Sequence, residues 1–308
     1  MSRKASIKIG HIKITDHLIL GVTKHKVDTE EEIFQHSQLE TVPMVSWNQV
    51  GDALIEKKID GAFMLAPYAM DLFKSGEKIK LVLLGHKNGS ILIKNKKANV
   101  KTFEDFKGKM VIIPYQLSVH NMLFHKILTE HGLDAGPAKD VSLEVFAPAQ
   151  IPEAIRLDDE GEIGGFIVAE PFGSQVVMAG LGEELALSKD IWPDHPCCVF
   201  VMRDEVVNKH EDAVYEIVDS LVKSGKFIKN NPDEASKIGA EFLGQQVDVI
   251  KKVLTEPADR ITTHELMPIL EDLDEIQRYM SQKMTAVKGL IDVDKFVDKK
   301  YAIAANAK

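Results

Sequence analysis

Cysteine is scarce in this chain. Only two of its 308 residues are cysteines, Cys197 and Cys198, and because they are adjacent they provide no disulfide framework. The sequence also has no glycine-rich phosphate loop, no His-Glu-x-x-His and no Gly-x-Ser-x-Gly. It therefore carries no motif of a phosphate-binding loop, a zinc protease or an α/β-hydrolase.

Positive charge is also in short supply. Lysine and arginine total 38 against 47 acidic residues, a formal net charge of −9. A nucleic-acid-binding protein presents a basic face, so this balance argues against a nucleic-acid partner. No apolar run reaches the ~18 residues that indicate a membrane span. The first ten residues lack the apolar core of a signal peptide, so we expect a cytoplasmic protein if residue 1 is the native start.

Strand patterns alternate with helix patterns through the first two thirds of the chain. Residues 5–14 alternate apolar and polar, as a half-buried strand does, and residues 109–114 are typical of a buried strand. Two sets of such elements, at 5–85 and 109–175, predict an α/β fold in which each of two lobes is a mostly parallel sheet flanked by helices. Residues 60–65 are predicted to form a short apolar strand. The chain after residue 208 is predicted to be nearly all helix, including a helix at 265–281.

The same pattern predicts where the lobes begin and end. The chain would cross between them near 86–95 and again near 188–200. We therefore expect a discontinuous lobe 1 at 1–92 plus 196–308, which includes the C-terminal helices, and lobe 2 at 93–195. Ligands of open α/β sheets bind beyond the carboxyl ends of the strands, so the segments that follow strands are the candidate site.

Eight short segments form a series in a characteristic order and spacing. They are 46–68 (SWNQVGDALIEKKIDGAFMLAPY), 86–89 (HKNG), 106–109 (FKGK), 112–120 (IIPYQLSVH), 165–172 (GFIVAEPF), 195–199 (HPCCV), 279–280 (YM) and 291–294 (IDVD). In this order they resemble the solute-binding proteins of ABC importers for nitrate, sulfonate, taurine and bicarbonate, a superfamily that also includes thiamin-precursor binders. The resemblance covers roughly residues 5–300. It implies a two-lobed periplasmic-binding-protein-like (type II) fold that closes on a small ligand by a hinge motion.

The segment Ser118-Val119-His120 opens a predicted helix directly after a strand. Free N–H groups and the helix dipole make such an end an anion site. Ser118 can add a hydroxyl donor, and His120 can add a donor or a positive charge. The alternative is an ordinary N-cap serine beside a surface histidine, and the resemblance favours the site.

Other candidates lie at the remaining strand ends. Asp16 can bind a ligand or cap the next helix, and the aromatic rings of Trp47 and Tyr68 can stack on a planar ligand. Core packing is the alternative for Trp47. Glu170 suits an ammonium, a protonated ring nitrogen or a metal, with a salt bridge as the alternative. The complete predicted ligand-binding set is Asp16, His17, Trp47, Ala66, Pro67, Tyr68, Gln116, Ser118, Val119, His120, Glu170 and His195.

Arginine placement limits the ligand. The five arginines are Arg3, Arg156, Arg203, Arg260 and Arg278, and none falls in a strand-end segment. A bidentate arginine clamp on a sulfonate or carboxylate is therefore not expected. Recognition would depend on backbone N–H groups, hydroxyls, histidines and Lys87. This predicts a small anion or a small heterocycle as the ligand.

The adjacent cysteines are predicted to have a structural role. Neighbouring residues of a strand point to opposite faces, and the spacing is not the Cys-x-x-Cys of a zinc site. Free cysteine is moreover among the most buried residue types. We therefore expect neither a metal nor a cofactor.

Three functions fit these observations. The resemblance implies the substrate-binding component of an ABC importer, without catalytic residues, periplasmic or at the cell surface, monomeric, and read by a permease. A cytosolic enzyme on the same fold, similar to thiamin-pyrimidine synthases or desulfinases, is the first alternative. A cytosolic ligand sensor that uses the same cleft is the second.

Overall fold

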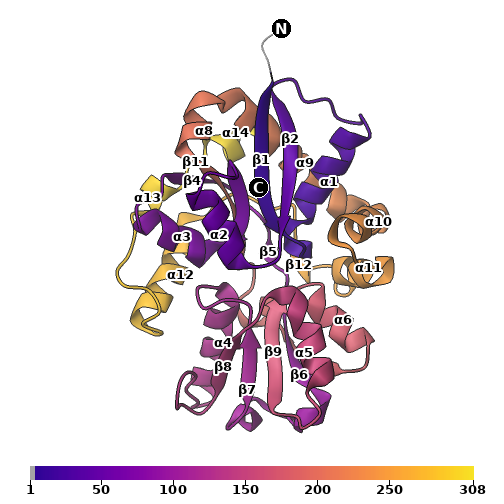
Figure 1. The fold of residues 1–308 in the computed structure, drawn as a ribbon, viewed down its shortest axis with the longest axis vertical. Coiled ribbons are helices and arrows are strands. Elements are labelled where there is room, and N and C mark those ends of the chain that lie inside the picture. Colours follow the sequence, from indigo (N-terminus) through magenta and orange to yellow (C-terminus); the bar gives the residue numbers. More distant parts are fainter. Residues whose placement is uncertain (1–3) are drawn as a thin grey trace.

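A computed structural model of the chain describes residues 4–308 and contains two five-stranded sheets (Figure 1). Residues 1–3, and with them Arg3, lie outside the described residues. In the view of Figure 1 one sheet lies above the other. A two-stranded ribbon of β5 (Lys87–Asn88) and β12 (Ile261–Thr262) lies between them.

The first sheet has the strand order β2-β1-β3-β11-β4. Strand β11 runs antiparallel to both of its neighbours, and the other four strands run in one direction. All five residues of β3 are buried, as expected for a central strand that is covered on both faces. The strands are β1 (Ala5–Ile12), β2 (Ser37–Met44), β3 (Gly61–Leu65), β4 (Ile79–Leu84) and β11 (Cys198–Arg203).

The second sheet has the strand order β10-β6-β9-β7-β8. Here β6 is the strand that runs against the other four, so both sheets are mostly parallel, as predicted. Strand β9 is buried along its whole length. The strands are β6 (Ser90–Asn95), β7 (Met110–Ile113), β8 (Ser142–Val145), β9 (Ile163–Ala169) and β10 (Gly182–Leu187).

Helices flank both sheets. Helix α1 packs against α9 and α10, whereas α12 contacts both α3 and α4. None of the helices described between residues 4 and 308 is long and apolar enough to cross a membrane. The α-helices are α1 (Leu18–Asp28), α2 (Trp47–Ile55), α3 (Ala66–Lys74), α4 (Val119–Glu130), α5 (Ile151–Leu157), α6 (Phe172–Met178), α7 (Ser188–Ile191), α8 (Asp204–Lys209), α9 (Glu211–Asn230), α10 (Pro232–Leu243), α11 (Val247–Thr255), α12 (Leu270–Gln282), α13 (Val293–Phe296) and α14 (Lys300–Ala304).

Two segments carry the chain from one sheet to the other. Residues 85–89 lead from β4 to β6, and residues 188–197 lead from β10 to β11. The two halves also touch directly. The backbone N–H of Thr15 donates to the carbonyl of Glu170 at 2.8 Å, and the Tyr115 hydroxyl donates to Oδ1 of Asn48 at 2.9 Å. The two sheets are therefore closed on the residues that lie between them.

Candidate functional site

Five buried side chains from four segments meet between the sheets. Asp16 and His17 lie in the 3-10 turn after β1, His86 lies on the first crossover, His120 in the first turn of α4, and His195 on the second crossover. Each is at most 1 % exposed. The positive charge of His86 contributes to lowering the pKa of each of the other three histidines.

Many polar atoms in this region have no partner. In the described part of the chain, eleven buried side-chain nitrogen or oxygen atoms lack a hydrogen bond, and nine of them belong to the segments just named and to their neighbours. An unpaired buried polar group costs about 1–3 kcal/mol, and native proteins leave few of them. A bound molecule would supply the missing partners. The nine residues are Thr15, Asp16, His17, Trp47, His86, Asn88, His120, Asn121 and His195.

Asp16 and His86 form the best-defined contact of the site. Oδ2 of Asp16 lies 3.0 Å from Nε2 of His86, whereas Oδ1 of Asp16 and Nδ1 of His86 have no partner. Gly89 lies beside these two atoms, and because it has no side chain it does not crowd them. Its φ is +85°, and a Cβ at this position would lie 3.0 Å from Oδ1 of Asp16 and 3.1 Å from Nδ1 of His86.

The capping role considered for Asp16 is wrong. Helix α1 begins at Leu18, and its N-cap residue is His17, which makes no side-chain cap bond. Asp16 lies inside the preceding 3-10 turn, and its carboxylate faces His86. The ring of His17 is fixed at Nδ1 by the backbone carbonyl of Ile12 at 2.9 Å, so that Nε2 is the nitrogen left without a partner.

Burial and mutual contact set the protonation of these groups. Burial raises the pKa of Asp16. Burial also opposes a charge on His86, but the Asp16 carboxylate outweighs it and raises the pKa of His86 to about 10. The pair therefore keeps at least one proton at neutral pH. Burial lowers the pKa of His120 and that of His195 to about 3, so these two imidazoles are neutral.

The two cysteines also face this pair, contrary to prediction. Cys197 precedes β11, which begins at Cys198, so the alternation of a strand does not separate their side chains. Sγ of Cys198 lies 4.0 Å from Oδ2 of Asp16, and the hydrogen bond from Cys198, together with His86, lowers the pKa of Cys197 to about 7. Burial raises the pKa of the Cys198 thiol. Both thiols are free and buried.

The start of α4 combines a helix cap with a site residue. The Ser118 hydroxyl accepts from the N–H of Asn121 at 3.1 Å and donates to the carbonyl of Tyr115 at 2.7 Å, so it is an ordinary cap. His120 is buried rather than on the surface. Its Nε2 lies 2.9 Å from Oγ of Ser90, and its Nδ1 is one of the atoms without a partner. Val119 is buried beside it.

The aromatic candidates divide in a similar way. Trp47 opens α2 in a buried position, its ring 5.9 Å from that of His17, and its Nε1 has no partner. Tyr68 packs on Tyr115 of the other half, with ring centroids 4.9 Å apart. Ala66 and Pro67, in the first turn of α3, are buried as well. Gln116 is exposed, so its side chain is the one candidate of the set on the surface.

Glu170 is bound to the protein itself. Its carboxylate accepts from Nη1 of Arg260 at 2.6 Å, and from the N–H and hydroxyl of Ser174 at 2.9 and 2.8 Å. The salt bridge that was the alternative interpretation is therefore present. Lys87, the other charged candidate, lies 3.4 Å from the carboxylate of Glu265.

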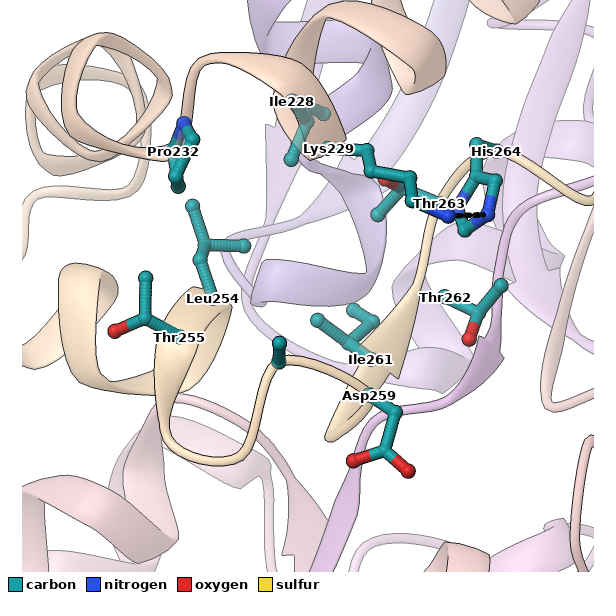
Figure 2. A pocket seen from close by; sticks show the side chains of 11 residues that line it. Ile228, Lys229, Pro232, Leu254, Thr255, Asp259, Ile261, Thr262, Thr263 and His264 are labelled. Carbon is teal, nitrogen blue, oxygen red and sulfur yellow. Dashed lines mark hydrogen bonds between the residues drawn. The ribbon is translucent and has the colours of Figure 1, made fainter.

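The predicted ligand-binding set left out several residues of this region, namely Thr15, His86, Asn88 and Asn121, and the positions of both thiols were not predicted. His86 and Asn88 stand in the HKNG segment that contributed to the resemblance, which was a signal for both. A surface pocket of about 430 Å³ also lies beside β12 (Figure 2). None of the predicted ligand-binding residues lines it; its walls include Ile228, Leu254 and Ile261.

Comparisons with known proteins agree with this architecture. The nitrate import ATP-binding protein NrtC of Synechocystis sp. is 32 % identical over 242 residues, which are 73 % of this chain and 35 % of NrtC. The chain thus spans about a third of the length of that relative. The zinc-bound ligand binding component of an ABC-type import system from Staphylococcus aureus has a TM-score of 0.86 at 28 % identity, covering 98 % of this chain and 99 % of that chain.

The fold extends to more distant proteins. The periplasmic nitrate-binding protein NrtA from Synechocystis PCC 6803 has a TM-score of 0.87 at 19 % identity, covering 98 % of this chain and 88 % of that chain. These likenesses confirm the expected periplasmic-binding-protein-like α/β fold. In sequence, residues 1–243 match the NMT1-like family. With 243 of 308 residues matched, the chain belongs to the NMT1-like family.

Proposed function

We propose that this chain is the substrate-binding component of an ABC importer and that it binds a small solute between its two sheets. The observation that carries the proposal is the group of nine buried residues with unpartnered polar atoms in that region. Similarity to ligand-binding components of import systems supports the same function. On this proposal the lobes, predicted as 1–92 plus 196–308 and 93–195, lie to either side of residues 85–89 and 188–197, because β6 already begins at Ser90 in the second sheet. These two crossovers act as the hinge.

The chemistry of the site favours a small neutral or weakly anionic solute. The two histidines His120 and His195 are neutral and can each donate or accept, Nε1 of Trp47 can donate, and Oδ1 of Asn88 can accept. Arg260, the one arginine buried within residues 4–308, already binds Glu170 and Glu184. A solute with both donors and acceptors, such as a small planar anion or a heterocycle, would match these groups.

Release of the solute requires the two halves to separate. The contacts that would break include Thr15 with Glu170, Tyr115 with Asn48, and Nδ1 of His125 with the Tyr279 hydroxyl at 3.0 Å. Arg260, from the C-terminal part of lobe 1, also pairs with Glu170 and Glu184 of lobe 2, so opening of the hinge has to break these ion pairs or carry Arg260 along with lobe 2. A permease would receive the released solute. The protein would act as a monomer, in the periplasm or at the cell surface.

A calorimetric and thermal-shift titration tests the proposal. The purified chain is titrated with nitrate, bicarbonate, an alkanesulfonate and a pyrimidine, and each mixture is assayed for chemical change of the solute. We expect saturable binding of at least one of them without turnover. A solute at 100 times its dissociation constant would add about 2.7 kcal/mol to the free energy of unfolding. Conversion of a bound solute into product would instead support the enzyme alternative.

A further inference from the structure

We propose that Asp16, His86, Cys197 and Cys198 form a binding site for a borderline-soft divalent metal ion such as zinc. The inference deepens the proposed function, on which it rests, because the ion would sit in the same region between the sheets. It differs from the sequence-based expectation, in which the cysteines had only a structural role.

The positions of the four side chains suit one small ion. Each residue offers one candidate ligand atom, and these atoms all lie within 4.8 Å of one another. Bonds of about 2.3 Å to sulfur and about 2.0–2.1 Å to nitrogen or oxygen place tetrahedral ligand atoms about 3.3–3.8 Å apart. The four side chains therefore need to close by roughly 1 Å to reach that geometry.

The ligand types select the ion. Two sulfurs and an imidazole favour zinc and similar ions, whereas magnesium and calcium prefer sites made of oxygen alone. All four side chains are at most 1 % exposed. Uncompensated charge is unfavourable in such a place, so without a cation burial favours the protonated form of the cysteines. A metal ion would displace the thiol protons and compensate the charge of the resulting thiolates and of the carboxylate.

A second observation concerns the remaining polar atoms of two of these side chains. Oδ1 of Asp16 and Nδ1 of His86 are buried and unpartnered, and both face the side of Gly89 where a Cβ would lie. Nε2 of His17, one residue away from Asp16, is also unpartnered. By contrast, the buried carboxylate of Glu170 has its partners in Arg260 and Ser174. The Asp16–His86 pair thus keeps buried polar atoms that the protein itself leaves without a partner.

Cobalt(II) provides a direct probe, since thiolate ligation produces charge-transfer bands in the near ultraviolet and tetrahedral geometry produces strong visible bands. The full-length chain is reduced, treated with a chelator, and titrated with cobalt and, in competition with a chromophoric chelator, with zinc. We expect one equivalent of either metal to bind. The Cys197→Ser/Cys198→Ser double variant should lose the charge-transfer bands and bind zinc at least about 100-fold more weakly.

Two further variants complete the design. His131→Gln alters an exposed histidine whose Nδ1 lies 2.6 Å from Glu104, and it should bind both metals as the unaltered chain does. If the double cysteine variant fails to fold, Asp16→Asn takes its place and should weaken zinc binding while leaving the charge-transfer bands. Absence of those bands in the reduced chain, or unchanged zinc binding in the double cysteine variant or in Asp16→Asn, would overturn the proposal.

The same experiment distinguishes the ion from the solute. Metal binding is measured without solute, and binding of nitrate, bicarbonate, alkanesulfonate and pyrimidine is measured with and without chelator. Solute binding without any metal binding would refute the metal site and leave the proposed function in place. Metal binding without binding of any of these solutes would refute the proposed function and leave the metal site in place.

Discussion

The neutral state of His120 predicts how the stability of the protein depends on pH. Burial is the main cause that lowers the pKa of His120 to about 3, with a smaller contribution from repulsion between protonated histidines, whereas an unfolded histidine has a pKa of about 6.5. The stabilisation is therefore fully present above about pH 6.5 and is lost as the pH falls toward 3, because only the unfolded state takes up the proton in that interval. Between pH 7.5 and 5.5 the loss from this one group is about 1.4 kcal/mol.

Urea unfolding of the unaltered chain and of His120→Gln at the two pH values measures this contribution. The drop in the free energy of unfolding from pH 7.5 to 5.5 should be about 1.4 kcal/mol smaller in the variant. Ser90→Ala is the matched control, since it removes the hydroxyl 2.9 Å from Nε2 of His120 but keeps the buried ring. It should lower stability at both pH values and retain the full pH-dependent drop. An equal drop in the unaltered chain and in His120→Gln would show that His120 is not held neutral.

Three further substitutions test other parts of the structure by urea unfolding. Arg260→Met leaves the buried Glu170 carboxylate without its cation and should lower the free energy of unfolding by about 3–5 kcal/mol. The double variant Arg260→Met/Glu170→Gln should regain much of that stability. A loss below about 1 kcal/mol in Arg260→Met would contradict a buried ion pair. Gly89→Ala places a Cβ close to Oδ1 of Asp16 on a residue whose φ is +85°, and it should lower the free energy of unfolding by at least about 1 kcal/mol. Unchanged stability would contradict the close approach of Asp16 to Gly89. Ser118→Ala removes the cap of α4 and should cost about 1 kcal/mol, with Ser46→Ala at the cap of α2 as the comparison; no loss in Ser118→Ala would contradict the cap.

Local sequence patterns were enough to predict most of the secondary structure. The apolar stretch predicted as a strand at 60–65 forms β3 (Gly61–Leu65), and Ser118 caps α4, which begins one residue later. Hydrophobic periodicity and capping depend on neighbours within a few residues, so they can be read from the chain directly. The helix predicted at 265–281 begins only at Leu270, because Pro268 disfavours a helical conformation in the residue before it.

The candidate site depended on contacts that no local pattern encodes. His86 meets Cys198 across 112 residues of sequence, and Arg260 meets Glu170 across 90. The pairing of Glu170 could not be predicted because Arg260 lies outside every segment that ends a strand in the first two thirds of the chain. The two thiols can face the same side because Cys197 lies outside β11, which begins at Cys198. Sequence patterns locate such a strand boundary only within a few residues, so the positions of the thiols could not be predicted.

A calorimetric titration of three proteins tests the central claim, binding of a small solute between the sheets, most directly. The unaltered chain, Trp47→Phe, and the exposed control His131→Gln are each titrated with nitrate, bicarbonate, an alkanesulfonate and a pyrimidine. Binding between the sheets predicts that at least one solute binds the unaltered chain and the control equally, and Trp47→Phe more weakly because Nε1 no longer donates. Failure of all four solutes to bind, or equal binding by all three proteins, would contradict the claim.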